Sequence, residues 1–454
     1  METFLIAVGA MVPMLVVLVV VHEFGHYATA RKLGVKVLEF GVGFPPRAYT
    51  LYTGKTRVLI SPETRFINLT GPSDIKVGSL VKVSSGEDSQ GNLVAQVIES
   101  PLAAKSLLAK LTGKRKSDAV SAPVQPDDLS DSDELLKHEG KVRAVEDGSI
   151  VLADMLYTMN WAPLGGFVRL AGESNPAVPR SLAGKGVGTR FLVLVAGPLM
   201  NAILPIAFFT VLLMMPQEIL VGQVAVDQVT EGSPAQSAGI KQHDIILNSD
   251  GRLIENAGDL IRYINLNGGS SMEWLVLRGN KQRVINVQPE FVGEEGRWLV
   301  GIATRLDNSH IEKRSQAPWT AFGNSFVNTW ELLRLVKQGI FGAFSSGSAP
   351  QLSGPIGIAQ IAGEFTKEGG LQGWMAITIL LSINLAILNI LPIPMLDGGR
   401  LVFVLLEWLR RGKRVPPDKE GLVHLVGFVV LIGFIILISA NDINRLIQGQ
   451  SFLG

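Results

Sequence analysis

Four long apolar runs constrain the fold of this chain more than any other feature of its sequence. They extend over residues 4–32, 191–215, 374–391 and 422–440. Each provides about the 20 mostly apolar residues that a helix needs to cross a bilayer. The composition agrees, because 47% of the 454 residues are hydrophobic and only 18% are charged. We therefore expect a polytopic α-helical membrane protein with about four transmembrane helices and soluble inserts.

The composition also limits the chemistry. The chain contains no cysteine, so any transition metal must be held by histidines and carboxylates rather than by thiolates. A net charge of +1 gives no indication of nucleic-acid binding. The first apolar run follows Glu2 instead of a basic segment, and no small-residue cleavage site follows Val21. We therefore expect this run to be retained as a helix and not removed as a signal peptide.

The first run ends in a candidate metal-binding motif, His22-Glu23-Phe24-Gly25-His26. On a helix, the two histidines share one face, so both imidazoles can reach one cation while Glu23 stands beside it to transfer a proton. Ionisable side chains in a membrane segment are costly and usually serve a function. The alternative is a helix end whose histidines only contact lipid headgroups.

A third candidate ligand, Asp397, follows the apolar run that ends near residue 391. Two prolines and two glycines surround it in the segment Asn389 to Gly399. Backbone freed at membrane depth must be satisfied by protein or by a water-filled cavity. Asp397 would either cap the next helix or join His22 and His26 in a site of two histidines and one carboxylate. Such a zinc site keeps one position open for water.

Together these residues resemble the site-2 proteases, a family of intramembrane zinc metalloproteases. The resemblance extends through five motifs in the family's order, and their combination is far more specific than any single motif. They are the residues 22–26, 165–170 (GGFVRL), 195–201 (VAGPLMN), 354–358 (GPIGI) and 389–399 (NILPIPMLDGG).

The resemblance implies a role for each matching residue. His22, His26 and Asp397 would hold one Zn²⁺, Glu23 would be the general base, and Asn389 would contact the substrate backbone. A membrane-dipping hairpin would hold the substrate as an extended strand through Gly165, Gly166, Phe167 and Val168.

The expected reaction is metal-assisted hydrolysis of a peptide bond in the transmembrane segment of a single-pass membrane protein. The substrate would already have been shortened by another protease, as in regulated intramembrane proteolysis of anti-sigma factors or removal of remnant signal peptides. The partners would be these substrates and membrane lipid, not nucleic acid.

A PDZ-like domain is expected between the second and third helices. Residues 231–247 combine a turn, a short helix, a glycine stop and a strand, and residues 259–264 indicate a second helix. PDZ domains accept an extended peptide at a sheet edge. Two roles remain open for this domain: peptide capture, or a size filter that keeps bulky ectodomains from the membrane site.

The segment between the first helix and the GG motif is longer than is usual in the family. Strand-like pieces at 79–83, 93–98, 141–145 and 149–152 predict a small β-rich insert, interrupted by a polar, disordered linker at 110–133. Apolar residues between 319 and 344 recur at helical spacing, which predicts an interfacial amphipathic helix. His138, His243 and His310 lie in polar segments, and we expect them to be exposed.

Basic residues near the apolar runs predict the orientation, because cytoplasmic loops are enriched in lysine and arginine. The protein would lie in a bacterial-type inner membrane, with both termini and the PDZ domain outside the cytoplasm. In chain order, the predicted regions are helix 1 (1–33), a cytoplasmic membrane-associated β region (34–72), the cytoplasmic insert (73–157), the GG hairpin (158–190), helix 2 (191–215), the PDZ domain (217–300), an amphipathic connector (301–373), helix 3 (374–399), a basic cytoplasmic loop (400–421), helix 4 (422–441) and a tail (442–454).

Two rival functions come from other classes. A metal transporter would also place histidine and aspartate in the membrane, but it should have internal repeats and several such residues along a path. An inactive membrane scaffold bearing a PDZ domain would have no reason to keep Glu23. Measuring bound metal together with cleavage distinguishes all three.

Overall fold

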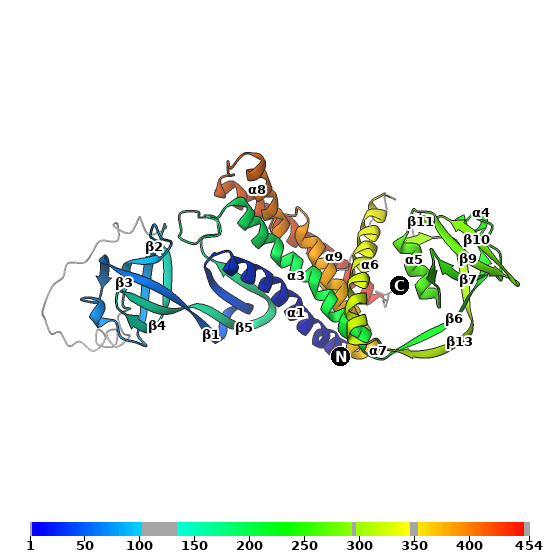
Figure 1. Ribbon diagram of the computed structural model, residues 1–454, viewed down its shortest axis with the longest axis horizontal. Helices are drawn as coiled ribbons and strands as arrows, with labels where there is room; N and C mark the ends of the chain where they lie inside the picture. Colours follow the sequence, from blue (N-terminus) through cyan, green and yellow to red (C-terminus); the bar gives the residue numbers. More distant parts are fainter. Residues whose placement is uncertain (1, 102–133, 174, 293–296, 346–352, 449–454) are drawn as a thin grey trace. The chain divides into compact units, whose positions relative to one another are not determined.

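The computed structural model describes residues 2–101, 134–173, 175–292, 297–345 and 353–448 (Figure 1). The predicted linker at 110–133 lies outside these residues. The chain forms two compact units. One contains residues 11–201 and 386–431, and the other contains residues 1–10, 202–385 and 432–454.

Among the described residues, four helices are long and apolar enough to cross a membrane, which agrees with the sequence-based expectation. They are α1 (Glu2–Lys32), α3 (Val187–Met214), α7 (Pro355–Ile390) and α9 (Pro417–Ile447). α7 starts well before the predicted third span. Gly370 interrupts it with φ 56° and ψ −134°, values that no helix adopts, so the predicted span corresponds to the part after this break.

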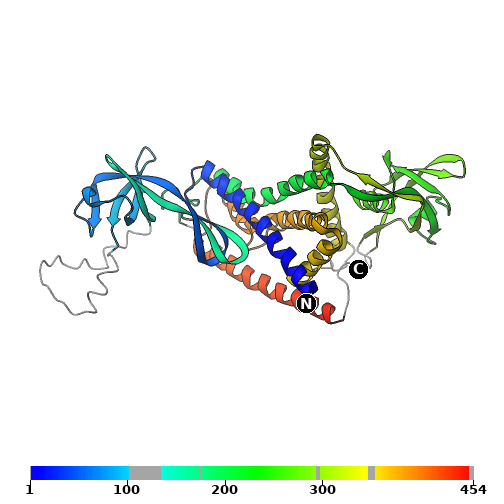
Figure 2. The same cartoon turned by 90° about the horizontal axis from the view of Figure 1, so that it is seen from below.

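Two long strands connect the end of α1 to a β-barrel. β1 (Val37–Ile67) pairs antiparallel with β5 (Ser149–Leu170), from Val37 opposite Leu170 to Leu59 opposite Ser149. Figure 2 shows this ribbon, with β1 in blue and β5 in teal. The predicted boundary between residues 157 and 158 falls inside β5, because the ladder with β1 continues through it.

The barrel closes in the order β1-β3-β2-β4-β5. Its remaining strands are β2 (Leu80–Glu87), β3 (Leu93–Glu99) and β4 (Leu136–Glu146), close to the positions expected from the sequence; the 3-10 turn η1 (Pro72–Asp74) precedes β2. The interior is mostly apolar and includes Val58, Ile98 and Leu152, none of which is measurably exposed. The expectation for His138 was wrong: it is only 2% exposed, because strict alternation along β4 turns it inwards with Leu136 and Val142.

Next to α1, the two strands form a small sheet by folding back. Residues 39–44 of β1 pair with 156–162 of β5 on one side, and residues 37–42 pair with 166–170 on the other. The return of β5 passes through Gly165 at φ +103°, and β1 bends at Gly43 at φ +82°. Both angles lie in the region that glycine adopts without strain. Residues 166–170 consequently form an edge strand.

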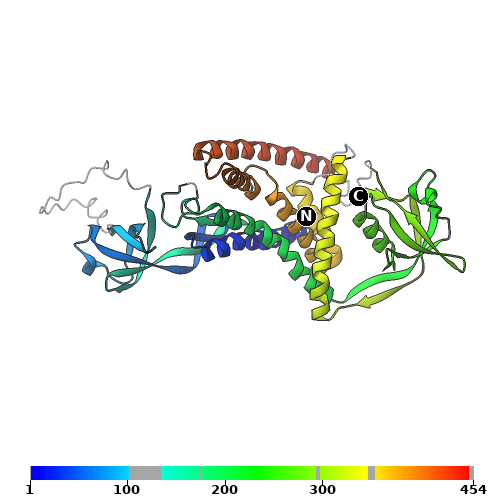
Figure 3. The same ribbon diagram turned by 45° about the horizontal axis from the view of Figure 1, so that its top comes forward.

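The second unit contains a separate sheet with the strand order β10-β9-β7-β6-β13 (Figure 3). Its fully buried side chains include Met272 and Trp274, which pack with Leu260. The expected turn, short helix, glycine stop, strand and second helix are all present. The elements are β6 (Gln217–Val229), α4 (Pro234–Ser237), β7 (Ile245–Ser249), β8 (Arg252–Leu253), α5 (Ala257–Leu266), β9 (Met272–Arg278), β10 (Lys281–Val287), β11 (Glu290–Val292), β12 (Arg297–Leu299) and β13 (Ile302–Arg314).

This sheet extends past the predicted end of the domain at residue 300. β13 pairs with β6 along its length, ending with Arg314 opposite Gln217, so residues 302–314 belong to the sheet and not to a connector. The expected amphipathic helix is α6 (Pro318–Ser345). α6 contacts α5 through the buried carboxylate of Glu331, which pairs with Arg252 and Arg262.

Candidate metal centre

Two glycines bring α1 and α3 together at the predicted motif. A Cβ added at Gly25 would lie 2.2 Å from the carbonyl oxygen of Ala196, and one at Gly197 would lie 2.3 Å from Nε2 of His26. Neither position has room for a side chain. The small residues let the two helix backbones approach closely, as at many helix contacts within membranes. His22 and His26 are buried as a result, at 8% and 9% exposed.

A tight connection places Asp397. Between α7 and α8 (Asp397–Leu409), the chain passes through Met395 at φ +77°. An added Cβ at Gly398 would lie 2.0 Å from the carbonyl oxygen of Leu391, and one at Gly399 would lie 2.5 Å from that of Ile393. The Asp-Gly-Gly sequence is therefore what allows the first turn of α8 to pack onto the connection.

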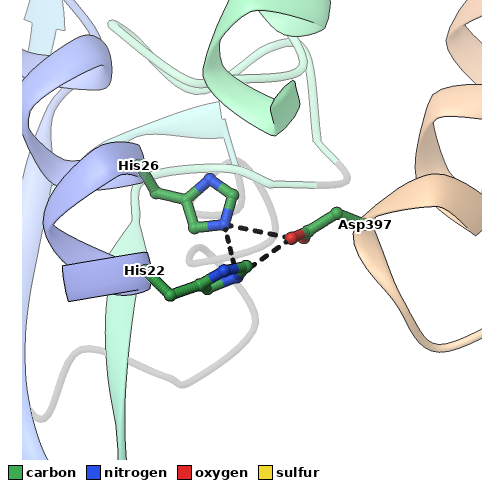
Figure 4. A group of neighbouring side chains, drawn as sticks. All are labelled: His22, His26 and Asp397. Atoms are coloured by element: carbon green, nitrogen blue, oxygen red, sulfur yellow. Dashed lines mark hydrogen bonds and ion pairs between the residues drawn. The ribbon is translucent and has the colours of Figure 1, made fainter. Parts of the chain in front are cut away.

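The structure argues against the capping role for Asp397. The N-cap position of α8 is Leu396, and no side chain caps this helix end. The carboxylate of Asp397 instead lies beside the two imidazoles (Figure 4). Its Oδ2 atom is 3.1 Å from Nε2 of His22 and 3.2 Å from Nε2 of His26.

The three side chains fit a divalent metal ion. Their ligand atoms lie within 4.8 Å of one another, and the Nε2 atoms of the two histidines are 3.2 Å apart. Two imidazoles and one carboxylate form a typical donor set for a catalytic zinc ion. His22 and His26 lie one helical turn apart on α1, whereas Asp397 comes from the start of α8, far along the chain. The convergence of these two segments supports the predicted grouping.

A second layer of contacts orients the histidines. Nδ1 of His26 donates to the carbonyl oxygen of Val193 at 2.7 Å, because a carbonyl can only accept. Nδ1 of His22 lies 3.3 Å from the side-chain amide of the fully buried Asn201. The amide nitrogen Nδ2 is the atom placed against Nδ1, but the oxygen and nitrogen of the amide exchange places by rotation, and the oxygen in that position accepts a hydrogen bond from the Nδ1–H group. With both Nδ1 atoms protonated, both Nε2 atoms are available to a metal.

Asn201 and the carbonyl of Val193 are the functional groups that sequence reasoning missed. Asn201 belongs to one of the five motifs, but the motif alone gave it no role. A carbonyl carries no side-chain signal at all. Only the position of α3 against α1 reveals these two partners.

Glu23 lies where the edge strand meets α1. The backbone of Val168 is within hydrogen-bonding reach of its carboxylate. A Cβ added at Gly166 would lie 3.4 Å from Cγ1 of Val19 and 3.7 Å from Cγ of Glu23. Residues 166–168 of β5 therefore lie directly against the helix face that carries the candidate base.

The structure also places the residues that were predicted to contact the substrate. Asn389 is 9% exposed and lies in the last turn of α7, shortly before Asp397. Gly165 and Gly166 are buried, whereas Phe167 and Val168 are half-buried. Their contact with a substrate stays a prediction.

α9 supports the connection that carries Asp397. Nδ1 of His424 accepts a hydrogen bond from the backbone N–H of Met395 at 2.9 Å. At the far end of α8, the carboxylate of Glu407 pairs with Arg190 at 2.6 Å and Arg414 at 3.2 Å. The α8 helix is thus held at both ends by neighbouring helices and loops.

The model of the family described as Peptidase family M50 matches residues 10–90 and 144–434 of this chain, which include all three candidate ligands. Between the two matched ranges, residues 91–143 are not matched, and they fall within the predicted β-rich insert. This is the segment that, judged from the sequence, is longer than is usual in the family.

Two bacterial proteins are similar over nearly the whole chain. The zinc metalloprotease RasP of Geobacillus kaustophilus is 28% identical, with 98% of this chain and 97% of that protein covered. The regulator of sigma-W protease RasP of Bacillus subtilis is 29% identical, with coverages of 94% and 96%. Among solved structures, the PDZ domain of an SdrC-like protein of Listeria innocua is 26% identical and covers 19% of this chain and 99% of that domain, with a TM-score of 0.17.

Proposed function

Because this chain belongs to peptidase family M50, we propose that it is an intramembrane zinc metalloprotease that cleaves transmembrane segments of single-pass membrane proteins. The observation that carries the proposal is the convergence of His22, His26 and Asp397 at the end of a membrane-spanning helix, with Glu23 beside them. The names of the two relatives, a zinc metalloprotease and a regulator of sigma-W protease, support it.

The chemistry follows from the donor set. One zinc ion held by His22, His26 and Asp397 would polarise the scissile carbonyl and lower the pKa of a water molecule. Glu23 takes the proton of the attacking water and passes it to the leaving amine. Val193 and Asn201 keep the imidazoles in the orientation that this ligand set requires.

The edge strand would hold the substrate. A transmembrane helix pairs its amides internally, so it must unwind before a protease can attack it, and its freed groups need new partners. Residues 166–170 pair with β1 on one side, and no strand in the described part of the chain pairs with their other side. This edge can add an extended peptide beside Glu23. Asn389 would hold the backbone of the same peptide.

The substrate would be a protein already shortened by another protease, as in the cleavage of anti-sigma factors. The domain formed by β6 to β13 would either capture the new peptide end or exclude bulky ectodomains. Deleting residues 218–313 separates the two roles. Gln217 and Arg314 lie opposite each other, so a short linker can rejoin them. Cleavage of full-length substrates by the deletion variant would support a filter, and loss of cleavage of a shortened substrate would support capture.

The proposed location is the bacterial plasma membrane. The end of α1, the start of α3 and the loop between α8 and α9 would face the cytoplasm, because cytoplasmic segments are enriched in basic residues and all three carry several of them. These basic residues are Arg31, Lys32, Lys36, Arg180, Lys185, Arg190, Arg410, Arg411, Lys413 and Arg414. The termini and the domain from β6 to β13 then face the opposite side.

The decisive experiment compares Glu23→Gln with the wild type in detergent or nanodiscs. We expect the variant to retain one zinc ion per chain, measured by elemental mass spectrometry, and to lose roughly a hundredfold or more of its cleavage rate on a transmembrane reporter. Glu63→Gln, at an exposed position on β1, is the matched control and should cleave normally.

Other outcomes point to the rival functions. Normal cleavage by Glu23→Gln would remove Glu23 from the role of base. A wild-type protein that moves zinc across vesicles without cleaving would be a transporter. A protein with neither zinc nor cleavage would be a scaffold.

A further inference from the structure

A basic cavity lies between the end of α1, the start of β1 and the barrel. Its volume is about 560 Å³, within the range of about 300–1,000 Å³ typical of small-molecule sites. Six basic side chains line it, against a single acidic one, Glu87. The basic residues are Arg31, Lys36, Lys55, Arg57, Arg180 and Lys185.

Half of these basic groups have carboxylate partners. Lys36 pairs with Asp154 at 2.8 Å, Arg57 with Glu146 at 2.5 Å, and Arg180 with Glu87 at 3.6 Å. The side chain of Lys36 is only 9% exposed, so this lysine contributes a buried basic group to the wall of the cavity.

The other three basic groups are not neutralised. Arg31 donates to the hydroxyls of Tyr27 and Tyr157 at 2.6 and 3.4 Å, and both of those groups are uncharged. In the part of the chain that the structure describes, Lys55 and Lys185 have no carboxylate within 4.0 Å. Like charges gathered around one cavity repel one another, and an anion that enters it relieves this repulsion.

We propose that this cavity binds a phosphate-bearing anion. Lysine and arginine together favour phosphate, because arginine donates in pairs and lysine adds a compact charge. Arg31 lies in the last turn of the membrane-spanning helix α1, where phospholipid headgroups are expected. The phosphate can come from an anionic lipid headgroup or from a free phosphate compound.

The test uses the full chain purified in neutral detergent and compares two phosphate sources. Native mass spectrometry measures the retention of added phosphatidylglycerol, with phosphatidylcholine as the lipid control. Thermal unfolding at constant ionic strength measures the effect of inorganic phosphate against chloride. The variant is Lys55→Gln with Lys185→Gln. Its matched control is Lys137→Gln with Lys141→Gln, which removes the same charge from exposed positions on β4 outside the cavity.

We expect the cavity variant to bind its ligand about tenfold more weakly or worse, because it loses two of the positive charges that attract an anion, and the control variant to bind normally. A difference confined to phosphatidylglycerol identifies a lipid headgroup, and a difference confined to inorganic phosphate identifies a soluble ligand. Equal binding by wild type and cavity variant in both arms overturns the proposal. If the double variant aggregates, Arg31→Gln gives the same comparison.

Discussion

At the scale of single residues, Gly197 determines how closely α3 can approach the metal ligands. Its missing side chain leaves the space in which the Nε2 atoms of both histidines lie, at 2.3 and 2.8 Å from the position of a Cβ. A methyl group there must displace either the imidazoles or the α3 backbone. Hydrogen bonds to α3 also orient both rings, so a shift of α3 both displaces the imidazoles and changes their orientation.

We predict that Gly197→Ala lowers the affinity for zinc about tenfold or more, with a matching loss of cleavage. Metal titration with a competing chelator measures the affinity. Gly188→Ala is the control, because it lies on the same helix with no atom within 4 Å of its added Cβ. Equal zinc affinities of the two variants would contradict the steric argument.

The metal ligands differed in how well the sequence predicted them. His22 and His26 follow from their helical spacing, because both must share a face of α1. Asp397 could be predicted only in combination with His22 and His26, since a lone aspartate before two glycines also suits a helix cap. The partnership with Asn201 depends on the packing of two helices, which the sequence does not specify.

At the scale of elements, a network of buried hydrogen bonds connects four strands of the barrel with Lys36, which follows the end of α1. Nε2 of His138 contacts Ser85 at 2.7 Å, and its Nδ1 contacts Asp154 at 2.6 Å. The same carboxylate binds Lys36 and Thr56. Burial alone would raise the pKa of Asp154, but the hydrogen bond from His138 and the charge of Lys36 lower it to about 2.

This network predicts a pH dependence of barrel stability. The folded pKa of Asp154 lies below its unfolded value, so its contribution of about 2 kcal/mol is present above pH ~4 and is lost as the pH falls towards 2. Hydrogen exchange of barrel peptides measures the free energy of opening. We expect Asp154→Asn to be less stable than wild type at pH 6 and the difference to shrink at pH 2.5. A difference that stays constant with pH would contradict the assignment.

The strands themselves could be predicted, but their closure could not. Alternating apolar residues placed β2, β3 and β4 near their observed positions. Which residues face inwards depends on the register of each strand. A register that is wrong by one residue assigns every side chain to the opposite face of the sheet. His138 was misjudged for this reason, since a polar neighbourhood in sequence says little about the inside of a closed barrel.

At the scale of the whole molecule, the four spans determine which parts of the chain share a compartment. Hydropathy predicted their number, because a long apolar segment can satisfy its own backbone groups within lipid by forming a helix. The end of the domain at residue 314 was missed, because β13 pairs with a strand far earlier in the chain, from Ile302 opposite Val229 to Arg314 opposite Gln217. Pairing over such separations leaves no local signal.

Cysteine labelling tests the proposed orientation. The chain has no native cysteine, so each introduced thiol reports alone. We predict that Lys281→Cys on β10 reacts with a membrane-impermeant maleimide in intact spheroplasts, whereas Lys137→Cys on β4 reacts only after lysis. Both positions are exposed, so access through the membrane is the only difference. Labelling of both before lysis, or the reverse pattern, would invalidate the topology.

The same two strands, β1 and β5, form part of the barrel and also the small sheet whose edge lies beside Glu23. Changing the length of either strand by one residue flips the faces beyond that point unless a new bulge absorbs the change, whereas changing it by two leaves every side chain on its original face. Insertions or deletions far out in the barrel should therefore impair proteolysis when they are odd and spare it when they are even. Whether a distant segment of the barrel gains or loses an odd or an even number of residues thus affects the reaction at Glu23.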